Sequence, residues 1–310
     1  LSLFNSMAGT SIYFEKSIRK VLKEIADSDI NSDGSSDYRN VKMVKKEVEE
    51  EIYVPMQNGE IYTGPLFIKR SDNPDIFTNA INGIYATINT ALNDIYTSGA
   101  NGAVRFLLTD TLYSNEALPI FIGNWPNASV VNTLTIKPRT GVTTLITGIS
   151  SAIFDINSAD HFILDGSNTA NGNTKDLTVS NFSETGTAIQ FINDARINTI
   201  KNCILKGNSS SSSNGVVTFL TTTGSEGNDS NTIQNNDITS NSGQPNYCLY
   251  NKGSGSSSNQ KNSHNRIIGN RIFNFAIRGI TDEGNSAATL YDGNEIYLLI
   301  PMTTRGAGFR

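Results

Sequence analysis

The sequence predicts an all-β fold: a right-handed parallel β-helix solenoid with an N-terminal capping helix, preceded by a small, mainly helical segment. The first observation is an eight-residue phrase that begins at Asn198, Asn231 and Asn265, at spacings of 33 and 34 residues. A fixed period of about 20–50 residues is typical of a solenoid, in which each unit buries its apolar face against its neighbours. The second observation is that these phrases are too short and too rich in Asn and Gly to form helices.

Each repeat is expected to hold three short strands. Two apolar positions, five residues apart, recur in every phrase, at Ile200 and Leu205, Ile233 and Ile238, and Ile267 and Ile272. Polar pairs lie between them, and Asn and Gly tolerate the left-handed backbone that a tight corner needs. The phrase is therefore predicted to form a strand, a corner and a second strand. A third β-rich run completes each coil, at residues 188–192, 216–220, 247–250 and 276–280.

Stacking of the coils in register predicts contacts between asparagines. Identical residues at equivalent positions form ladders along the axis of stacked strands. We therefore expect Asn235 to hydrogen-bond to Asn202, and Asn236 to Asn270. The role expected for these asparagines is corner formation rather than ligand binding.

The repeat extends in both directions from the three clear phrases. Upstream, residues 160–166 fit the phrase when Phe162 is aligned with Ile200. Downstream, residues 294–296 match residues 270–272 after only 24 residues, which predicts a shortened last coil. The solenoid is therefore expected to continue beyond the best-matched repeats.

A helix is expected before the first coil. Apolar residues at positions 84, 88, 91, 92 and 95 have helical spacing, so residues 84–95 are predicted to form an amphipathic helix. A solenoid needs a cap over the open end of its core. This helix is predicted to be that cap.

Charge divides the chain near residue 78. Charged side chains make up 23 of the first 78 residues but only 30 of the other 232. We therefore predict a charged, mainly helical segment over residues 1–78 and the β-helix over residues 79–300. Residues 301–310 are expected to be a tail at which the chain is cut short.

The amino-terminal segment contains a candidate calcium loop. Apolar residues at helical spacing predict helices over residues 18–25 and 41–48, with an acidic loop between them. This helix, loop and helix resemble an EF-hand or dockerin-type site, whose ligand positions one, three, five and nine match Asp29, Asn31, Asp33 and Asp37. The last loop position is Asn40 rather than Glu, and the usual apolar position is Ser36. The alternative is a polar turn between two solvated helices, with no cofactor.

Composition excludes several classes of protein. The net charge is −5 and no basic stripe occurs, which argues against nucleic acid as a partner. The two cysteines, Cys203 and Cys248, do not make a disulfide framework and are expected to be buried thiols. The sequence contains no apolar run of about 18 residues, so it predicts no membrane span. No signal peptide is visible, and the oligomeric state is left open.

The order of these segments resembles a known family. It runs from the helix with Tyr85-Ala86-Thr87-Ile88 through strands at residues 104–113, 133–138 and 162–166 to the Asn-Thr-Ile coils. This order is similar to the right-handed β-helix, or pectin-lyase-like, region of large secreted proteins from Bacteroidota, over about residues 80–298. The resemblance implies a secreted or cell-surface location, and it specifies architecture more than activity.

The resemblance also raises the question of catalysis, since many right-handed β-helices are polysaccharide lyases or hydrolases. Glycoside hydrolysis uses paired carboxylates. The clustered Asp pairs and Gly-His-Gly of polygalacturonase-like enzymes do not occur here, and His161 and His264 lie in other contexts. The nearest catalytic candidates are Asp282, Glu283 and Arg278, although solvated loop carboxylates are the more ordinary interpretation.

Binding of polysaccharide has more support. A solenoid presents long, flat strand faces, and aromatic rings provide stacking surfaces for sugars. The candidate ligand-binding residues are Trp125, in a loop with Pro and Asn neighbours, and the tyrosines Tyr247, Tyr250 and Tyr291. The alternative for the tyrosines is stacking inside or along the coil.

The leading hypothesis is a non-enzymatic, secreted or cell-surface module that contacts polysaccharide or other surfaces in adhesion. One alternative is a polysaccharide lyase or glycoside hydrolase of pectin-lyase-like fold. Another is a structural stalk within a larger surface protein. Exposed aromatics along a face would favour glycan binding, whereas a featureless polar exterior would favour the stalk.

Overall fold

The computed structural model divides the chain into two compact units, Leu1–Ile61 and Tyr62–Arg310. The boundary predicted near residue 78 lies outside the described residues and stays a prediction. The structure describes residues 14–27, 42–55, 67–68, 84–98, 103–255, 257–299 and 307–309.

The described part of the first unit consists of two strands rather than the predicted helices, so the helical prediction is wrong. Lys20 pairs with Glu49, and Val21 with Val48, across an antiparallel ladder. Val21 and Val48 are β-branched, a residue type that favours strands. Helical spacing within one segment takes no account of such a partner segment. The two strands are β1 (Phe14–Asp27) and β2 (Lys42–Pro55).

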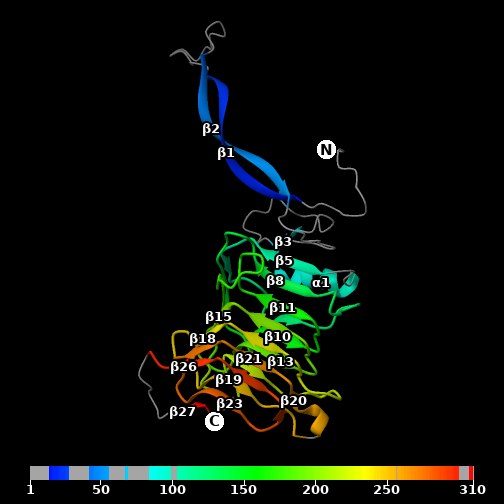
Figure 1. Ribbon diagram of the computed structural model, residues 1–310. Helices are drawn as coiled ribbons and strands as arrows, with labels where there is room; N and C mark the ends of the chain where they lie inside the picture. Colours follow the sequence, from blue (N-terminus) through cyan, green and yellow to red (C-terminus); the bar gives the residue numbers. More distant parts are fainter. Residues whose placement is uncertain are drawn as a thin grey trace. The chain divides into compact units, whose positions relative to one another are not determined.

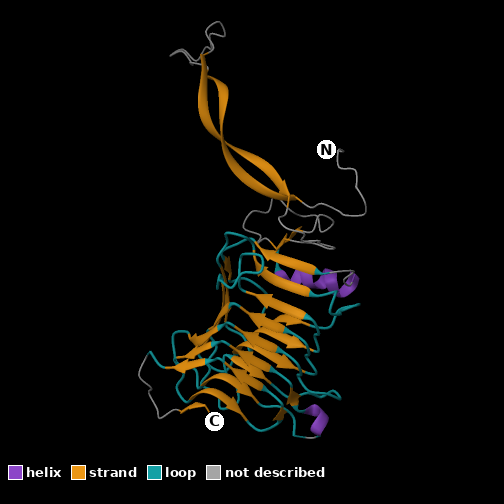
Figure 2. Cartoon of the chain, in the orientation of Figure 1, coloured by secondary structure: helices purple, strands orange, loops and turns teal. Residues whose placement is uncertain are grey.

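The second unit is a parallel β-helix, which confirms the predicted all-β solenoid (Figures 1 and 2). Each coil adds one strand to each of three parallel sheets within the described residues. The first sheet contains β4 (Ile84–Tyr85), β3 (Phe67–Ile68), β5 (Val104–Leu108), β8 (Leu134–Pro138), β11 (Phe162–Asp165), β14 (Thr199–Lys201), β17 (Thr232–Gln234), β21 (Arg266–Ile268) and β25 (Leu290–Asp292).

The other two sheets are built in the same way. A few short elements lie outside the three sheets. The second sheet contains β6 (Leu112–Tyr113), β9 (Thr144–Gly148), β12 (Leu177–Asn181), β15 (Cys203–Gly207), β18 (Asp237–Ser240), β22 (Arg271–Phe273) and β26 (Glu295–Tyr297). The third contains β7 (Ile120–Ile122), β10 (Ala152–Asn157), β13 (Thr187–Ile192), β16 (Val217–Phe219), β19 (Tyr247–Asn251), β23 (Arg278–Asp282) and β27 (Ala307–Phe309). A small parallel pair joins β20 (Asn262–Ser263) to β24 (Ser286–Ala287), after a 3-10 turn at Ser258–Gln260.

The register of the clear repeats is the predicted one. Ile200, Ile233 and Ile267 are successive partners in the first sheet. The upstream alignment is wrong by two residues, because Leu164 rather than Phe162 pairs with Ile200. Side chains alternate with a period of two, so a two-residue shift keeps the same side chains inward. The apolar pattern therefore fits both registers equally well.

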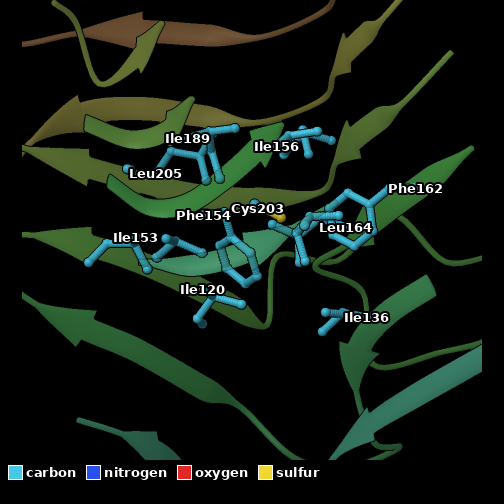
Figure 3. Close-up of a cluster of buried hydrophobic side chains, with 14 of the residues drawn as sticks. Ile120, Ile136, Ile153, Phe154, Ile156, Phe162, Leu164, Ile189, Cys203 and Leu205 are labelled. Atoms are coloured by element: carbon cyan, nitrogen blue, oxygen red, sulfur yellow. The ribbon is translucent and has the colours of Figure 1, made fainter. Parts of the chain in front are cut away.

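Apolar side chains from all three sheets fill the interior. Figure 3 shows part of it, where Ile120, Phe154 and Ile189 come from three successive strands of the third sheet. Further along the axis, the rings of Phe191 and Phe219 stack with centroids 4.5 Å apart. All five side chains are at most 1% exposed. Burial of each such side chain contributes about 1.5–3 kcal/mol, so the interior holds the coils together.

The predicted asparagine contacts are confirmed. Nδ2 of Asn235 donates to Oδ1 of Asn202 at 2.7 Å, and Nδ2 of Asn236 donates to Oδ1 of Asn270 at 3.1 Å. Asn202 and Asn235 have φ angles of 58° and 52°, in the left-handed region that a tight corner needs. Their expected role in corner formation is therefore seen in the backbone.

A further ladder of asparagines lies at the corner before the first sheet. Nδ2 of Asn198 donates to Oδ1 of Asn231 at 3.0 Å, and the backbone N–H of Asn231 donates to Oδ1 of Asn265 at 2.8 Å. These three residues are at most 1% exposed. Buried amides need hydrogen-bond partners, and here the asparagine of each coil bonds to the asparagine of the next.

The capping helix is present as α1 (Ile88–Ser98), displaced by a few residues from the predicted range. Ile88, Ala91, Leu92 and Ile95 are at most 4% exposed and belong to the same apolar core as the coils. Helix α1 lies beside the first strands of the solenoid in Figure 1. In the described part of the chain, no helix combines the length and the apolar character required to cross a membrane.

Candidate functional site

An exposed aromatic ring lies on the outer face of the third sheet, at Phe121. In β7 the flanking residues Ile120 and Ile122 are fully buried, whereas Phe121 is 45% exposed. Its ring bends over Gly123, where an added Cβ would lie 2.5 Å from Cε1. A side chain at residue 123 would therefore displace the ring. The glycine gives Phe121 a place against the backbone while leaving nearly half of the side chain open to solvent.

Tyr96 of α1 holds this ring from the side. Its ring meets that of Phe121 edge to face, with centroids 6.5 Å apart and an interplanar angle of 70°. The Tyr96 hydroxyl donates to the carbonyl oxygen of Phe121 at 2.6 Å and accepts from the N–H of Gly123 at 2.9 Å. Burial raises the pKa of Tyr96 to about 12, and the Gly123 hydrogen bond partly opposes that rise. The capping helix therefore holds the backbone that follows the exposed ring, from the carbonyl of Phe121 to the N–H of Gly123.

Polar side chains continue the row from Phe121 along the solenoid axis. Asp155 of β10 is the register partner of Phe121, and Gln190 of β13 is the partner of Asp155. Nε2 of Gln190 donates to Oδ1 of Asp155 at 2.8 Å. No described residue donates a hydrogen bond to Oδ2 of Asp155. We call Phe121, Asp155 and Gln190 the Phe121 row.

A second polar pair lies where these strands end, at the last residue of β10 and the residue that follows β13. Nδ2 of Asn193 donates to Oδ1 of Asn157 at 3.1 Å, and both side chains are partly exposed. Together with the Phe121 row, this pair places a ring, a carboxylate and several amides on one outer face. Such groups suit a sugar, whose CH groups pack on a ring and whose hydroxyls bond to carboxylate and amide groups.

The aromatic residues singled out in the sequence are mostly covered. Trp125 is 2% exposed and lies in the apolar core, so it presents no stacking surface. Tyr247 and Tyr250 are 8% and 1% exposed, and their rings pack against each other with centroids 5.3 Å apart. Tyr291 is partly buried against the core. Side-chain stacking along the coil accounts for the two β19 tyrosines.

The structure brings these tyrosines together with the candidate carboxylates. The Tyr250 hydroxyl donates to Glu283, and the Tyr291 hydroxyl donates to Oδ2 of Asp282 at 3.0 Å. Burial, followed by the hydrogen bond to Glu283, raises the pKa of Tyr250. Burial, followed by the charge of Asp282, raises the pKa of Tyr291.

Asp282 has further partners, whereas Arg278 lies elsewhere on the same strand. Oδ2 of Asp282 accepts from Oγ of Ser286 at 2.7 Å, and Oδ1 accepts from the N–H of Gly284 at 3.0 Å. Arg278 begins β23 opposite Tyr247, whereas Asp282 ends it. The carboxylate is thus engaged within its own loop.

The candidate calcium ligands Asp29, Asn31, Asp33 and Asp37 lie outside the described residues, so that site stays a prediction. The segments that flank them are strands, not the helices of the motif. Within the described ranges, no group of three or more His, Cys, Asp or Glu side chains is arranged to hold a metal ion.

The sequence contained a signal for Phe121 that the prediction missed. Strand alternation places Phe121 on the face opposite to Ile120 and Ile122, and a glycine two residues later leaves room for a close approach. Trp125 was predicted to be exposed because of its Pro and Asn neighbours, which are compatible with an exposed or a buried loop.

The fold and the Phe121 row define a parallel β-helix with a mixed aromatic and polar outer face. Comparisons with protein-family models, curated proteins and solved structures give no match for this chain.

Proposed function

We propose that this protein is a non-enzymatic, secreted or cell-surface β-helix module that binds polysaccharide along the Phe121 row. The observation that carries the proposal is the 45% exposed ring of Phe121 in register with Asp155 and Gln190. An exposed ring beside hydrogen-bonding oxygen and nitrogen atoms fits the two chemical faces of a sugar. Location outside the cell follows from the sequence resemblance alone.

The spacing of the row favours an extended polymer. Neighbouring strands lie about 4.8 Å apart, so the three side chains of the row follow one another at a regular interval across β7, β10 and β13. Asp155 is a carboxylate that accepts hydrogen bonds from sugar hydroxyls and repels acidic sugars. The proposed ligand is therefore a neutral polysaccharide.

The two alternative functions have less support. For a lyase or hydrolase, the candidate carboxylates Asp282 and Glu283 are already engaged by the tyrosines of the same cluster. For a stalk, an exposed aromatic ring held in place by Tyr96 serves no evident purpose. The same experiment separates all three.

The test is affinity electrophoresis of the whole chain in a panel of neutral polysaccharides, with and without calcium, followed by a product assay on each polymer that binds. Phe121→Ala is expected to weaken binding about threefold to tenfold, because an aromatic contact contributes about 0.5–1.5 kcal/mol. Phe182→Ala is the matched control, since Phe182 is 44% exposed but lies outside the row.

The outcomes are distinct. Retarded migration that Phe121→Ala reduces and Phe182→Ala preserves supports the binding module. New reducing or unsaturated ends would identify an enzyme instead. Absence of binding to every polymer in the panel would leave the stalk as the better account.

A further inference from the structure

The exposed part of the Phe121 row has two ends. Beyond Gln190, the next register partner is Thr218 of β16, which is fully buried. Its hydroxyl accepts from the N–H of Gly215 at 3.0 Å, so the chain before β16 covers this position. At the other end, β7 is the last described strand of the third sheet, and Tyr96 bonds to the edge that β10 leaves free. The open face is therefore three strands wide.

Two polar edges run along this face over β10 and β13. Asp155 and Gln190 form one edge, with Nε2 of Gln190 2.8 Å from Oδ1 of Asp155. Asn157 and Asn193 form the other edge, with Nδ2 of Asn193 3.1 Å from Oδ1 of Asn157. All four side chains are partly exposed. A ligand that lies along the solenoid axis therefore meets hydrogen-bonding groups on both of its sides.

The ring of Phe121 lies at the end of the strip between these two edges. Phe121 is the register partner of Asp155, so Gly123, two residues later, is in line with Asn157. The ring bends from Phe121 over Gly123, and it therefore crosses from the line of the first edge to the line of the second. A sugar unit that stacks on this ring is followed, along the axis, by units above β10 and β13. Those units lie between the polar edges.

This arrangement fits a straight glycan with hydroxyls at both edges. In a β-1,4-linked chain of glucose or xylose, the equatorial hydroxyls leave from both edges and the CH groups form the two flat faces. An apolar ring below one unit and polar groups beside the next units match that pattern. Neighbouring strands lie about 4.8 Å apart, close to the length of one sugar unit in such a chain, so three strands correspond to about three units. An α-1,4-linked chain curves and departs from a straight row.

We propose that the Phe121 row binds three consecutive units of a β-1,4-linked glucan or xylan along the solenoid axis, an assignment that rests on the polysaccharide binding proposed above. The first unit stacks on the ring of Phe121. The second lies between Asp155 and Asn157, and the third between Gln190 and Asn193. Oδ2 of Asp155, to which no described residue donates, accepts from a hydroxyl of the second unit.

The test is isothermal titration of the whole chain with cello-oligosaccharides and xylo-oligosaccharides of one to six units. Malto-oligosaccharides of the same lengths are the ligand control, because they carry the glucose units of the cello series in α-1,4 linkage. Affinity is expected to rise with each unit up to three and to change by less than about twofold beyond three units. Maltotriose is expected to bind about tenfold more weakly than cellotriose.

Variants at β13 test the position of the third unit. Gln190→Ala is expected to lower the affinity for cellotriose about threefold to tenfold and to leave that for cellobiose unchanged, because only the third unit loses a hydrogen-bond partner. Asn193→Gly is expected to have the same selective effect from the other edge. The φ of Asn193 is 57°, which glycine adopts without strain, so this variant keeps the fold. Phe121→Ala is expected to weaken every length, and Phe182→Ala none.

Several results would overturn the proposal. These are an affinity that keeps rising beyond four units, equal binding of maltotriose and cellotriose, or equal losses for cellobiose and cellotriose in both Gln190→Ala and Asn193→Gly. Absence of binding to both β-linked series would also overturn it. If another neutral polysaccharide still binds in a way that Phe121→Ala weakens, the proposed polysaccharide binding stands without this assignment. If Phe121→Ala changes the migration of the protein in no polymer, the proposed function itself fails.

Discussion

The ring of Phe121 occupies the space in which a side chain of Gly123 would lie. An added Cβ at Gly123 would be 2.5 Å from Cε1 of Phe121, which is the far end of a flexible side chain. The backbone around both residues is fixed by the hydroxyl of Tyr96. A change at residue 123 is therefore expected to move the ring rather than the strand.

This relationship predicts that Gly123→Ala separates stability from binding. The ring can rotate away, so the free energy of unfolding is expected to fall by less than about 1 kcal/mol. Binding of a neutral polysaccharide is expected to weaken as much as in Phe121→Ala. Denaturant unfolding and affinity electrophoresis measure the two effects. Gly243→Ala is the control, because nothing lies within 4 Å of its added Cβ. Unchanged polysaccharide binding in Gly123→Ala would show that the ring position is irrelevant.

The buried asparagine ladder predicts a large effect at Asn231. Its Oδ1 accepts from both the backbone N–H and Nδ2 of Asn198, at 3.1 and 3.0 Å, and its Nδ2 donates to the carbonyl oxygen of Ala195 at 2.9 Å. Asn231→Ala leaves these buried groups without partners and is expected to destabilise the fold by about 2–4 kcal/mol. Denaturant unfolding checks this value. Asn259→Ala, at an exposed position, is expected to change stability by less than about 0.5 kcal/mol, and a similar loss in both variants would contradict the ladder.

A strained corner predicts a stabilising substitution at Ile197. This residue has a φ of 57° and is 49% exposed, although β-branched residues disfavour the left-handed region. His161, Ser230 and His264 have φ angles of 63°, 57° and 57° at the equivalent corners of other coils. Ile197→Asn is expected to stabilise the protein by about 1 kcal/mol, measured as a higher melting temperature. Ile197→Val, which keeps the branching, serves as the control and is expected to give no gain.

The raised pKa of Tyr96 predicts a loss of stability at alkaline pH. The phenol of an unfolded chain ionises near pH 10, whereas burial raises the pKa of Tyr96 to about 12 in the folded protein. The unfolded state therefore releases this proton first. The stabilising contribution is fully present below pH 10 and is lost as the pH rises toward 12. Thermal melts from pH 9 to pH 12 are expected to show a smaller alkaline loss in Tyr96→Phe than in the unchanged protein. Equal losses would assign the alkaline transition to other groups.

The repeat itself was sufficient to predict the solenoid, and the reason is local. The role of each residue follows from its own chemistry. Ile233 is branched and apolar, which suits an inward position in a strand, whereas Asn235 tolerates the left-handed backbone of a corner. Copies at a fixed period must then stack on one another, so the pairing of Asn235 with Asn202 followed from the spacing. The candidate site was harder to predict from the sequence than the fold. Exposure of Phe121 and burial of Trp125 depend on neighbours that are distant in the sequence, such as Tyr96.

The sequence by itself therefore determined the parallel β-helix, the corners of the three clear repeats, the Asn202–Asn235 and Asn236–Asn270 contacts and the capping helix. The tertiary structure alone decided three matters: the strand pairing of β1 with β2, the partner of Ile200 in the upstream coil, and which aromatic rings meet solvent. Local backbone preference and a repeated apolar pattern act within a single coil and can be read along the chain. Strand pairing, a register shift of two residues and the exposure of a side chain each depend on a second segment, whose position is fixed only when the chain has folded.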